Sequence, residues 1–177
     1  MTPSEVVLES ARLELRPFHP RDAAELHALF LDADVARHLL DGERVPRSWV
    51  EDEITGSRDR FETLGCGLWS VRRAGESPII GIVGYRYFFD PPELELLYAL
   101  LPSAWGAGFA TEAAEAVTAY AFDRLDFAVV RAAVDEPNTA SIRVLERLDM
   151  SQWKAEGDAP DRTLFYEVDA EAWAMRP

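Results

Sequence analysis

Residues 93–113 read ELELLYALLPSAWGAGFATEA, and this stretch decides the fold. Apolar residues dominate it as far as Leu101, which predicts a strand that Pro102 ends. Gly106 and Gly108 then mark a turn, and small residues at helical spacing form the inward stripe of a helix: Ala110, Ala113, Ala114, Val117 and Ala121. The first N–H groups of such a helix lack partners within it, and the helix dipole adds positive potential. The stretch therefore predicts an anion site that suits a phosphate.

Two well-known phosphate loops do not fit this turn. A nucleoside-triphosphate loop ends in Gly-Lys-Ser/Thr, but Phe109 follows Gly108, which disfavours triphosphate hydrolysis. A dinucleotide fingerprint needs Gly or Ala where Thr111 stands, and it follows the first strand of its unit rather than a mid-chain strand. A tight turn without a ligand stays open as the alternative for the two glycines.

Outward from this stretch, the pattern predicts one mixed α/β domain over residues 1–177. Alternating apolar residues predict a first strand over 11–18, and helical spacing predicts a helix or helix pair from Pro20. A further helix follows Pro46 and is interrupted by Gly56; its expected buried side carries Val50, Ile54, Phe61 and Leu64. The remaining elements are three strands of an antiparallel meander (68–72, 78–88, 93–101), a helix (107–125), a strand (128–134), a helix (139–148) and two closing strands (152–155, 163–168).

Composition excludes several classes of function. The chain has 32 acidic and 18 basic residues, a net charge of -14 that opposes binding to nucleic acid and mildly favours cationic substrates. The single cysteine cannot form an internal disulfide, and no apolar run approaches the roughly 20 residues that span a bilayer. We therefore expect a cytoplasmic protein without a membrane partner. His19, His27 and His38 show no metal-ligand spacing, so no metal is expected.

The turn and two further segments resemble one family. Residues 105–113 resemble the acetyl-CoA pyrophosphate loop of the GNAT superfamily of N-acetyltransferases, and are most similar to the branch of ribosomal-protein N-terminal (alanine or serine) acetyltransferases and relatives. Residues 138–148 resemble the family's Asn-x-x-Ser motif, and residues 12–17 resemble the opening strand of the same branch. The resemblance covers nearly the whole chain.

This resemblance implies a fold and a cofactor site. The fold is a mixed, mostly antiparallel sheet of about seven strands with flanking helices, splayed between the fourth and fifth strands. The acetyl-CoA arm would pair with the strand edge at Tyr98, Ala99 and Leu100, where a β-bulge near Tyr98 would aim an N–H at the thioester oxygen. The remaining cofactor contacts would come from the turn and from the next motif: Trp105, Gly106, Ala107, Gly108, Phe109, Ala110, Thr111 and Asn138.

Four residues at three sites depart from the family pattern. Ala107 replaces a frequent lysine, so one cationic contact near the phosphates is missing, although backbone donors remain. Leu145 stands where many members have the tyrosine that protonates the departing thiolate. Asp149-Met150 replaces the usual Gly-Phe. A tyrosine general acid at position 145 is therefore excluded.

The catalytic candidates follow from these constraints. Glu95 lies on the cofactor strand between two leucines, where burial would raise its pKa, and it is the candidate base. The alternative is that Glu95 and Glu93 both lie on a solvated face of the strand. Ser141 is the candidate donor to the leaving thiolate, with a helix-start polar residue as its alternative, and Asn138 is also a potential helix cap. Cys66 lacks a neighbouring histidine, so we expect packing rather than catalysis.

The expected activity is transfer of an acetyl group from acetyl-CoA to a primary amine, either a protein N-terminus or a small-molecule amine. The alternatives are a catalytically silent CoA-binding module with a regulatory or interaction role and, more remotely, a structural partner protein. A homodimer is common among relatives and stays open here. Acidic residues hint at a cationic acceptor, although a solvated surface explains them equally well: Asp32, Asp34, Asp41, Glu43, Glu51, Asp52 and Glu53.

Overall fold

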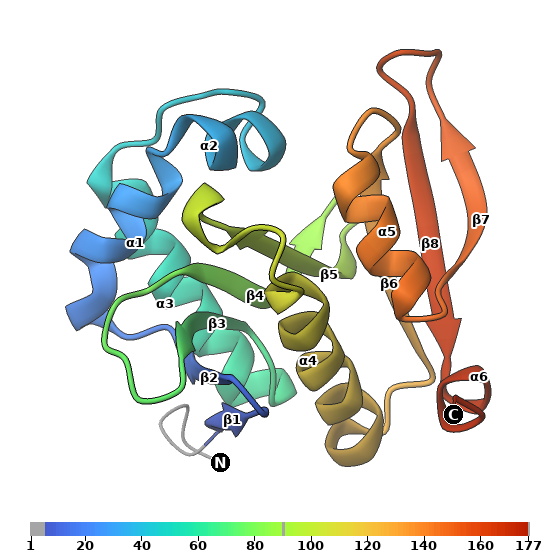
Figure 1. The fold of residues 1–177 in the computed structure, drawn as a ribbon, viewed down its shortest axis with the longest axis horizontal. Helices are drawn as coiled ribbons and strands as arrows, with labels where there is room; N and C mark the ends of the chain where they lie inside the picture. Colours follow the sequence, from blue (N-terminus) through green and yellow to red (C-terminus); the bar gives the residue numbers. More distant parts are fainter. Residues whose placement is uncertain (1–5, 90, 177) are drawn as a thin grey trace.

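A computed structural model describes residues 6–89 and 91–176. Figure 1 shows two halves that face one another across a vertical gap, with α2 and β5 bordering it on one side and α5 and β6 on the other. The elements in chain order are β1 (Leu8–Glu9), β2 (Leu13–Pro17), α1 (Ala23–Phe30), α2 (Ala33–Leu39), α3 (Arg47–Leu64), β3 (Leu68–Arg73), β4 (Gly81–Phe88), β5 (Glu93–Leu100), α4 (Phe109–Leu125), β6 (Val129–Asp135), α5 (Thr139–Arg147), β7 (Ser151–Glu156), β8 (Thr163–Asp169) and α6 (Ala170–Ala174).

The strands form two antiparallel sheets that separate between β5 and β6. The first has the order β1-β2-β3-β4-β5 and the second the order β6-β8-β7. β5 and β6 touch, yet no ladder joins their described residues. This is the predicted splay between the strands at 93–101 and 128–134, and the short β1 raises the strand number to eight. The open edge of β5 therefore faces a gap rather than a neighbouring strand.

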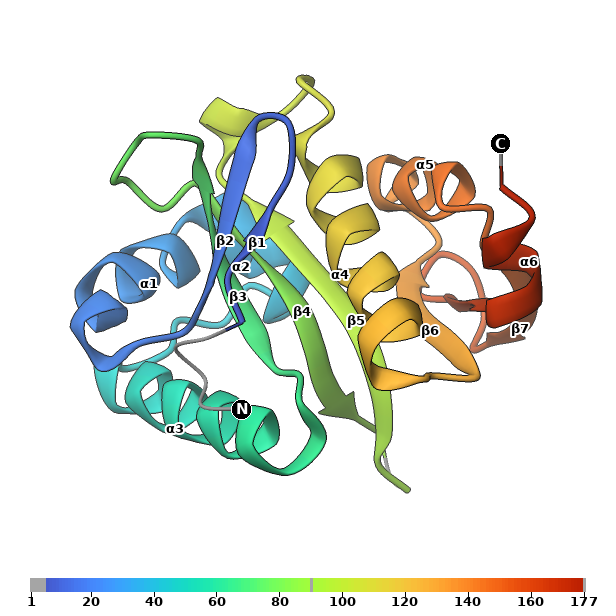
Figure 2. The same ribbon diagram turned by 90° about the horizontal axis from the view of Figure 1, so that it is seen from below.

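Helices cover the five-stranded sheet on both faces. Figure 2 shows α1 and α3 on one side of this sheet and α4 on the other. β5 contributes alternately to the two apolar cores, as strand geometry requires. Leu94, Leu96 and Tyr98 pack with the core on the α4 side, whereas Leu97 and Ala99 pack with the core formed by α1, α2 and α3. The two faces of β5 thus pack against different apolar cores.

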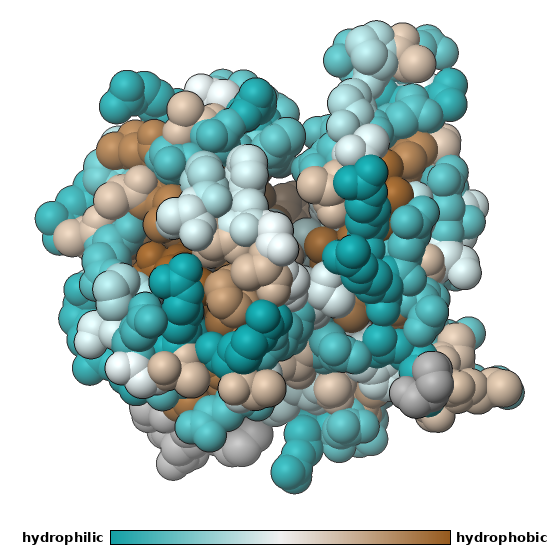
Figure 3. Space-filling view, viewed as in Figure 1, coloured by the Kyte–Doolittle hydropathy of each residue, from teal (hydrophilic) through white to brown (hydrophobic). Residues whose placement is uncertain are grey.

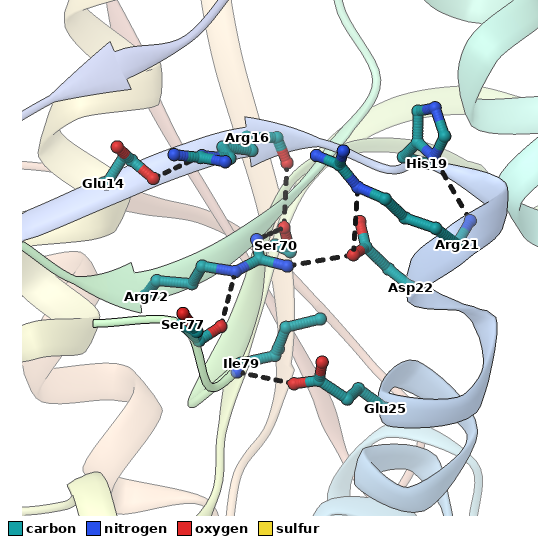
Figure 4. Close-up of polar contacts among 10 residues, drawn as sticks. All are labelled: Glu14, Arg16, His19, Arg21, Asp22, Glu25, Ser70, Arg72, Ser77 and Ile79. Carbon is teal, nitrogen blue, oxygen red and sulfur yellow. Dashed lines mark hydrogen bonds and ion pairs between the residues drawn. The ribbon is translucent and has the colours of Figure 1, made fainter. Parts of the chain in front are cut away.

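A buried ion pair fixes the start of α1 to β3. Arg72 Nη2 donates to Asp22 Oδ1 at 3.0 Å, and Arg72 Nε donates to the carbonyl of Ser77 at 2.9 Å. The Ile79 N–H donates to Glu25 Oε2 at 3.0 Å, which adds a second tie (Figure 4). Removing one partner of such a buried pair typically costs about 3–5 kcal/mol. This network holds α1, and with it α2, beside the gap.

Most predicted elements are confirmed, with several corrections. The helix after Pro46 is not interrupted, because α3 runs through Gly56 and its packing offsets the roughly 1 kcal/mol that glycine costs in a helix. Leu64 at its end is 38% exposed rather than buried. The strand expected from residue 78 begins at Gly81, since the Ile79 N–H is engaged by Glu25. The short β1 and α6 were not predicted.

Candidate active site

A cavity of about 700 Å³ lies between the two halves of the molecule. Figure 3 shows it as a hollow with apolar side chains along its walls. It follows β5 from the β4–β5 turn to the turn before α4, and residues 95–100 of β5 line it. Its walls also include α2, the end of β6 and one side of α5 along the length of that helix. The cavity is therefore open to the edge that β5 leaves unpaired.

The turn before α4 is built as an anion cradle. Gly106 and Gly108 adopt φ values of 74° and 79°, a conformation that favours glycine. Gly108 precedes α4 without a side-chain cap, which leaves the first N–H groups of the helix available. Thr111 adds a buried hydroxyl with no hydrogen-bond partner, and both glycines and Thr111 line the cavity. The helix begins at Phe109, two residues later than predicted.

Hydrogen bonds from the β1–β2 turn hold the turn before α4 in place. Arg12 Nε donates to Glu112 Oε2 at 2.7 Å, and Arg12 Nη1 donates to the carbonyl of Ala107 at 2.9 Å. Ser10 Oγ donates to the other carboxylate oxygen at 2.8 Å, while the Arg12 guanidinium lies 4.7 Å from the Phe109 ring centroid. Hydrogen bonds from Ser10 and Arg12 outweigh burial and lower the pKa of Glu112. The local sequence gives no signal for this network, because 100 residues separate Arg12 from Glu112.

The edge of β5 exposes alternate peptide groups to the cavity. The Leu101 N–H donates to the carbonyl of Ile80 at 2.9 Å, so by alternation the peptide groups of Tyr98 and Leu100 point away from β4. Trp105 Nε1 already donates to the Leu100 carbonyl at 2.7 Å. The β4–β5 register is continuous from Gly81–Leu100 to Phe88–Glu93, so the expected β-bulge near Tyr98 is absent. Regular pairing along all of β4 leaves no extra residue for it.

Tyr98 and Ser141 meet across the cavity. The Tyr98 hydroxyl lies 2.7 Å from Ser141 Oγ and donates to the Ser141 carbonyl at 3.0 Å. The Ser141 N–H donates to Asn138 Oδ1 at 3.1 Å, which makes Asn138 the cap of α5 and leaves its amide NH₂ for other partners. Burial raises the pKa of Tyr98, opposed by the Ser141 hydrogen bond. The sequence did not indicate this pairing, although it selected all three residues.

Glu95 is a buried carboxyl that lines the cavity. It is 3% exposed, and its Oε1 has no hydrogen-bond partner, so the solvated-face alternative is wrong for this residue. Its register partner Arg86 instead donates to Glu53 Oε2 at 3.0 Å. Burial, with the charge of Glu93 as a smaller cause, raises the pKa of Glu95 to about 7. Such a group can accept a proton near neutral pH.

Two arginines of α5 complete the lining. Arg143 and Arg147 lie one helical turn apart, line the cavity, and have no ion-pair partner among the residues that the structure describes. They place cationic side chains at the end of the cavity near α4, where Ala107 supplies no charge. Both lie within residues 138–148, which were predicted only as the Asn-x-x-Ser motif; their spacing of four residues was the signal that could have identified them.

The comparison with protein families decides the identity. A family model described as acetyltransferase (GNAT) domain matches residues 12–151, which is most of the chain. The chain belongs to the GNAT acetyltransferase family. This assignment makes it an acyltransferase, of the N-acetyltransferase class that uses acetyl-CoA.

The relatives of this GNAT acetyltransferase match four fifths or more of its length. The uncharacterized protein YkkB of Bacillus subtilis (strain 168) is 31% identical over 148 residues, which span 81% of this chain and 84% of YkkB. The uncharacterized N-acetyltransferase YoaA of the same strain is 26% identical over 170 residues, covering 92% and 96% of the two chains.

Solved structures share the fold. A GNAT-family acetyltransferase from Bacillus anthracis has a TM-score of 0.78 at 22% identity, with coverage of 94% of this chain and 99% of that one. RimL, a ribosomal L7/L12 α-N-protein acetyltransferase solved in complex with coenzyme A, has a TM-score of 0.80 at 16% identity, with coverage of 94% and 99%. These likenesses confirm the predicted GNAT fold.

Other candidate groups lie outside the site of this acetyltransferase. Cys66 is fully buried, does not line the cavity, and burial raises the pKa of its thiol to about 11, which keeps it protonated. No cluster of three potential metal ligands occurs within residues 6–89 and 91–176. Over the same described ranges, no helix is both long and apolar enough to cross a membrane. Aromatic residues also lie at the end of β4 and directly after it: Tyr85 is buried, whereas Phe88 and Phe89 line the cavity.

Proposed function

We propose that this GNAT domain binds acetyl-CoA in the cavity along β5 and transfers the acetyl group to a primary amine by direct attack. One observation carries the proposal: a buried carboxyl and a hydroxyl pair line the same cavity from opposite faces of β5. Glu95 shares the face of Leu97 and Ala99, whereas Tyr98 lies on the α4 side with Ser141. An amine can therefore approach from one face while a leaving group departs on the other.

The residues of the cavity fit acetyl-CoA. The N–H groups at the start of α4 and the hydroxyl of Thr111 suit a pyrophosphate, and Arg143 with Arg147 suits a further phosphate. The outward peptide group of Tyr98 suits an amide of the pantetheine arm, whereas the peptide group of Ala99 faces β4. The NH₂ of Asn138 is a further donor toward that arm.

Bound acetyl-CoA supplies the acetyl group as an activated thioester. Glu95 accepts the proton of the acceptor ammonium, directly or through one water, and so provides a neutral amine. Its pKa of about 7 narrows the gap to the pKa of the ammonium, which is about 8 for a protein N-terminus and about 10.4 for an alkylamine. The walls of the cavity hold the amine against the acyl carbon, which lowers the entropic barrier.

Ser141 donates a hydrogen bond to the departing sulfur, and Tyr98 holds the Ser141 hydroxyl in position. Since Leu145 is buried and has no polar group, this pair takes the place of a tyrosine at position 145. Because the pKa of Tyr98 is raised, its phenol stays protonated throughout. Its single proton can turn from the Ser141 carbonyl to Ser141 Oγ when the Ser141 hydroxyl donates to the sulfur.

A catalytically silent CoA-binding module is the second candidate, favoured by Leu145 and Ala107. Amine-dependent release of free CoA thiol by wild type, Glu95→Gln and Ser141→Ala separates the two, with Glu62→Gln as a control on an exposed face of α3. We expect kcat to fall by about 10²–10⁴ in Glu95→Gln, as for loss of a general base, and Glu62→Gln to match wild type. Binding of acetyl-CoA without turnover of any amine would support the silent module instead.

A further inference from the structure

An acidic residue lies in the first turn of α4, at the end of the helix that the proposed function assigns to the pyrophosphate. Glu112 follows the N-cap residue Gly108 by four positions, and no side chain caps this end. The helix dipole attracts a carboxylate and a phosphate alike, so the two compete for the same positive end. A glutamate in the first turn can also accept from N–H groups at the start of its helix. Glu112 therefore disfavours a bound phosphate unless its charge is neutralised and its oxygens have other partners.

The β1–β2 turn supplies donors to both carboxylate oxygens of Glu112. Oε1 accepts from Ser10 Oγ at 2.8 Å and from the backbone N–H of Arg12 at 2.9 Å. Oε2 accepts from Arg12 Nε at 2.7 Å, and Arg12 Nη2 lies 2.5 Å from the same oxygen. Burial raises the pKa of Glu112, but the hydrogen bonds from Ser10 and Arg12 outweigh it, so the carboxylate stays ionised. Its negative charge is thus held on the β1–β2 turn and paired with a guanidinium.

Arg12 also contacts the turn that precedes α4. Figure 2 shows the β1–β2 turn beside this segment, and Arg12 Nη1 donates to the Ala107 carbonyl at 2.9 Å. Its Nη2 lies 3.6 Å from the position that a Cβ would take on Gly108, and its guanidinium lies 4.7 Å from the Phe109 ring centroid. One side chain therefore contacts three consecutive residues of the turn and the carboxylate in the first turn of the helix.

Arg12 and Glu112 both lie outside the cavity. Gly108, Phe109 and Thr111 line it, whereas the ion pair stands behind them. The Arg12 side chain is 50% exposed and that of Glu112 is 17% exposed. The influence of this pair on a bound phosphate therefore passes through the N–H groups of α4 and through the electrostatic potential at the start of the helix.

We propose that Arg12 is a positioning residue for the pyrophosphate of acetyl-CoA, which neutralises Glu112 and keeps its carboxylate away from the N–H groups at the start of α4. This inference rests on the proposed function and adds a residue outside the cavity to its cofactor site. A purely structural tie would be weakened equally by loss of either partner. Neutralisation makes the partners unequal, because Glu112 repels a phosphate and Arg12 cancels that repulsion.

The test measures the Kd of acetyl-CoA by calorimetric titration of the purified full-length protein at low salt. The variants are Arg12→Gln, Glu112→Gln, their combination and Arg12→Lys, which keeps the charge. Arg16→Gln is the matched control: Arg16 pairs with Glu14 of β2, its side chain is 44% exposed, and neither residue lines the cavity. Thermal unfolding without ligand shows that each variant is folded, and steady-state kinetics give kcat and the KM for acetyl-CoA.

We expect Arg12→Gln to raise the Kd about fivefold, the order that one charge at a partly exposed helix end implies. The KM for acetyl-CoA should rise in parallel while kcat stays unchanged, and added salt should reduce the difference. Glu112→Gln should bind at least as tightly as wild type, and the double variant should return to within about twofold of it. Arg12→Lys should keep most of the affinity, and Arg16→Gln should match wild type.

A symmetric result would overturn the inference. Equal weakening by Arg12→Gln and Glu112→Gln, or a double variant as weak as Arg12→Gln, would leave only a structural tie. Should Arg12→Gln fail to fold, Glu112→Gln still decides, since weaker binding by this variant contradicts neutralisation.

A substrate without phosphates tests where Arg12 acts. S-acetylpantetheine lacks the pyrophosphate, so wild type and Arg12→Gln should use it with equal kcat/KM; a loss as large as that for acetyl-CoA would overturn the inference. Binding of acetyl-CoA with one affinity by wild type and all variants would refute this inference alone. No binding by the folded wild type would refute the proposed function as well.

Discussion

The hydroxyl of Tyr98 lies 2.7 Å from Ser141 Oγ, and this contact joins β5 to α5 across the line where the two sheets separate. The backbone N–H of Ser141 is itself held by Asn138 Oδ1, so the cap fixes the position of Ser141 while the Tyr98 hydroxyl contacts its side chain. A hydroxyl held in this way loses little freedom when it donates to a substrate atom. The contact therefore supports a direct role for Ser141 and a positioning role for Tyr98.

Replacing Tyr98 with phenylalanine should lower kcat about tenfold, since about 1–1.5 kcal/mol of hydrogen bonding would be lost from the transition state. The KM for acetyl-CoA should change little, because the peptide group of residue 98 is retained. Steady-state kinetics on Tyr98→Phe check this, with Tyr87→Phe as an exposed control. An unchanged kcat, or a loss expressed only in KM, would refute the positioning role.

The rate should depend on pH through Glu95. Burial and Glu93 raise its pKa to about 7, opposed by a backbone hydrogen bond with Ala133 and by Arg131, while Arg86 is held by Glu53. The carboxylate is the basic form, so kcat/KM should rise with pH and level off above about 7. Glu95→Gln should lose this limb of the profile and retain only residual activity. A wild-type profile that stays flat between pH 5 and 8 would show that Glu95 is not the base.

Stability should show the opposite trend. A carboxyl whose pKa is raised on folding holds its proton in the folded state while the unfolded chain releases it. The folded state therefore loses stability as pH rises from about 4.5 to about 7, by on the order of 3 kcal/mol. Chemical denaturation at pH 5 and pH 8 should show that Glu95→Gln gains stability relative to wild type at the higher pH. An identical pH dependence in both proteins would contradict the burial of this charge.

Arg143 and Arg147 should recognise a phosphate of the cofactor. Replacing either with alanine should raise the KM for acetyl-CoA about tenfold, in line with one charged hydrogen bond. The effect should shrink for 3′-dephospho-acetyl-CoA, because the partner group is then absent. Arg124→Ala is the matched control, since this exposed arginine has no ion pair within the described residues and does not line the cavity. Equal effects on both cofactors would assign the arginines another role.

The sequence predicted the elements that have a strong local pattern. The alternation along β5 and the two glycines before α4 identified the cofactor strand and its turn, because both signals depend on neighbouring residues. Glu95 was also identified as a candidate base, but its burial was not predicted. That burial depends on β6 and on the hydrogen bond from Arg86 to Glu53. The pattern of alternating Glu93 and Glu95 is the same for a buried and for an exposed face.

Contacts between segments that lie far apart in the sequence could not be predicted from it. The hydrogen bonds from Arg12 to Glu112 join residues 100 positions apart in the sequence, and the contact of Tyr98 with Ser141 joins residues 43 positions apart. The β-bulge was expected from the family pattern rather than from these residues, and the regular β4–β5 register has no place for it. The local sequence determines whether a segment forms a strand or a helix, whereas the strand register and the direction of each side chain depend on packing.

The central claim is that the turn before α4 holds the phosphates of acetyl-CoA. Calorimetric titration with acetyl-CoA tests it on wild type, Gly108→Trp and Gly75→Trp. Both glycines have positive φ, 79° and 77°, so the two variants carry similar backbone strain, but only Gly108 lines the cavity. We predict saturable binding by wild type and Gly75→Trp and none by a folded Gly108→Trp. Equal binding by all three proteins, or no binding by the folded wild type, would contradict the account.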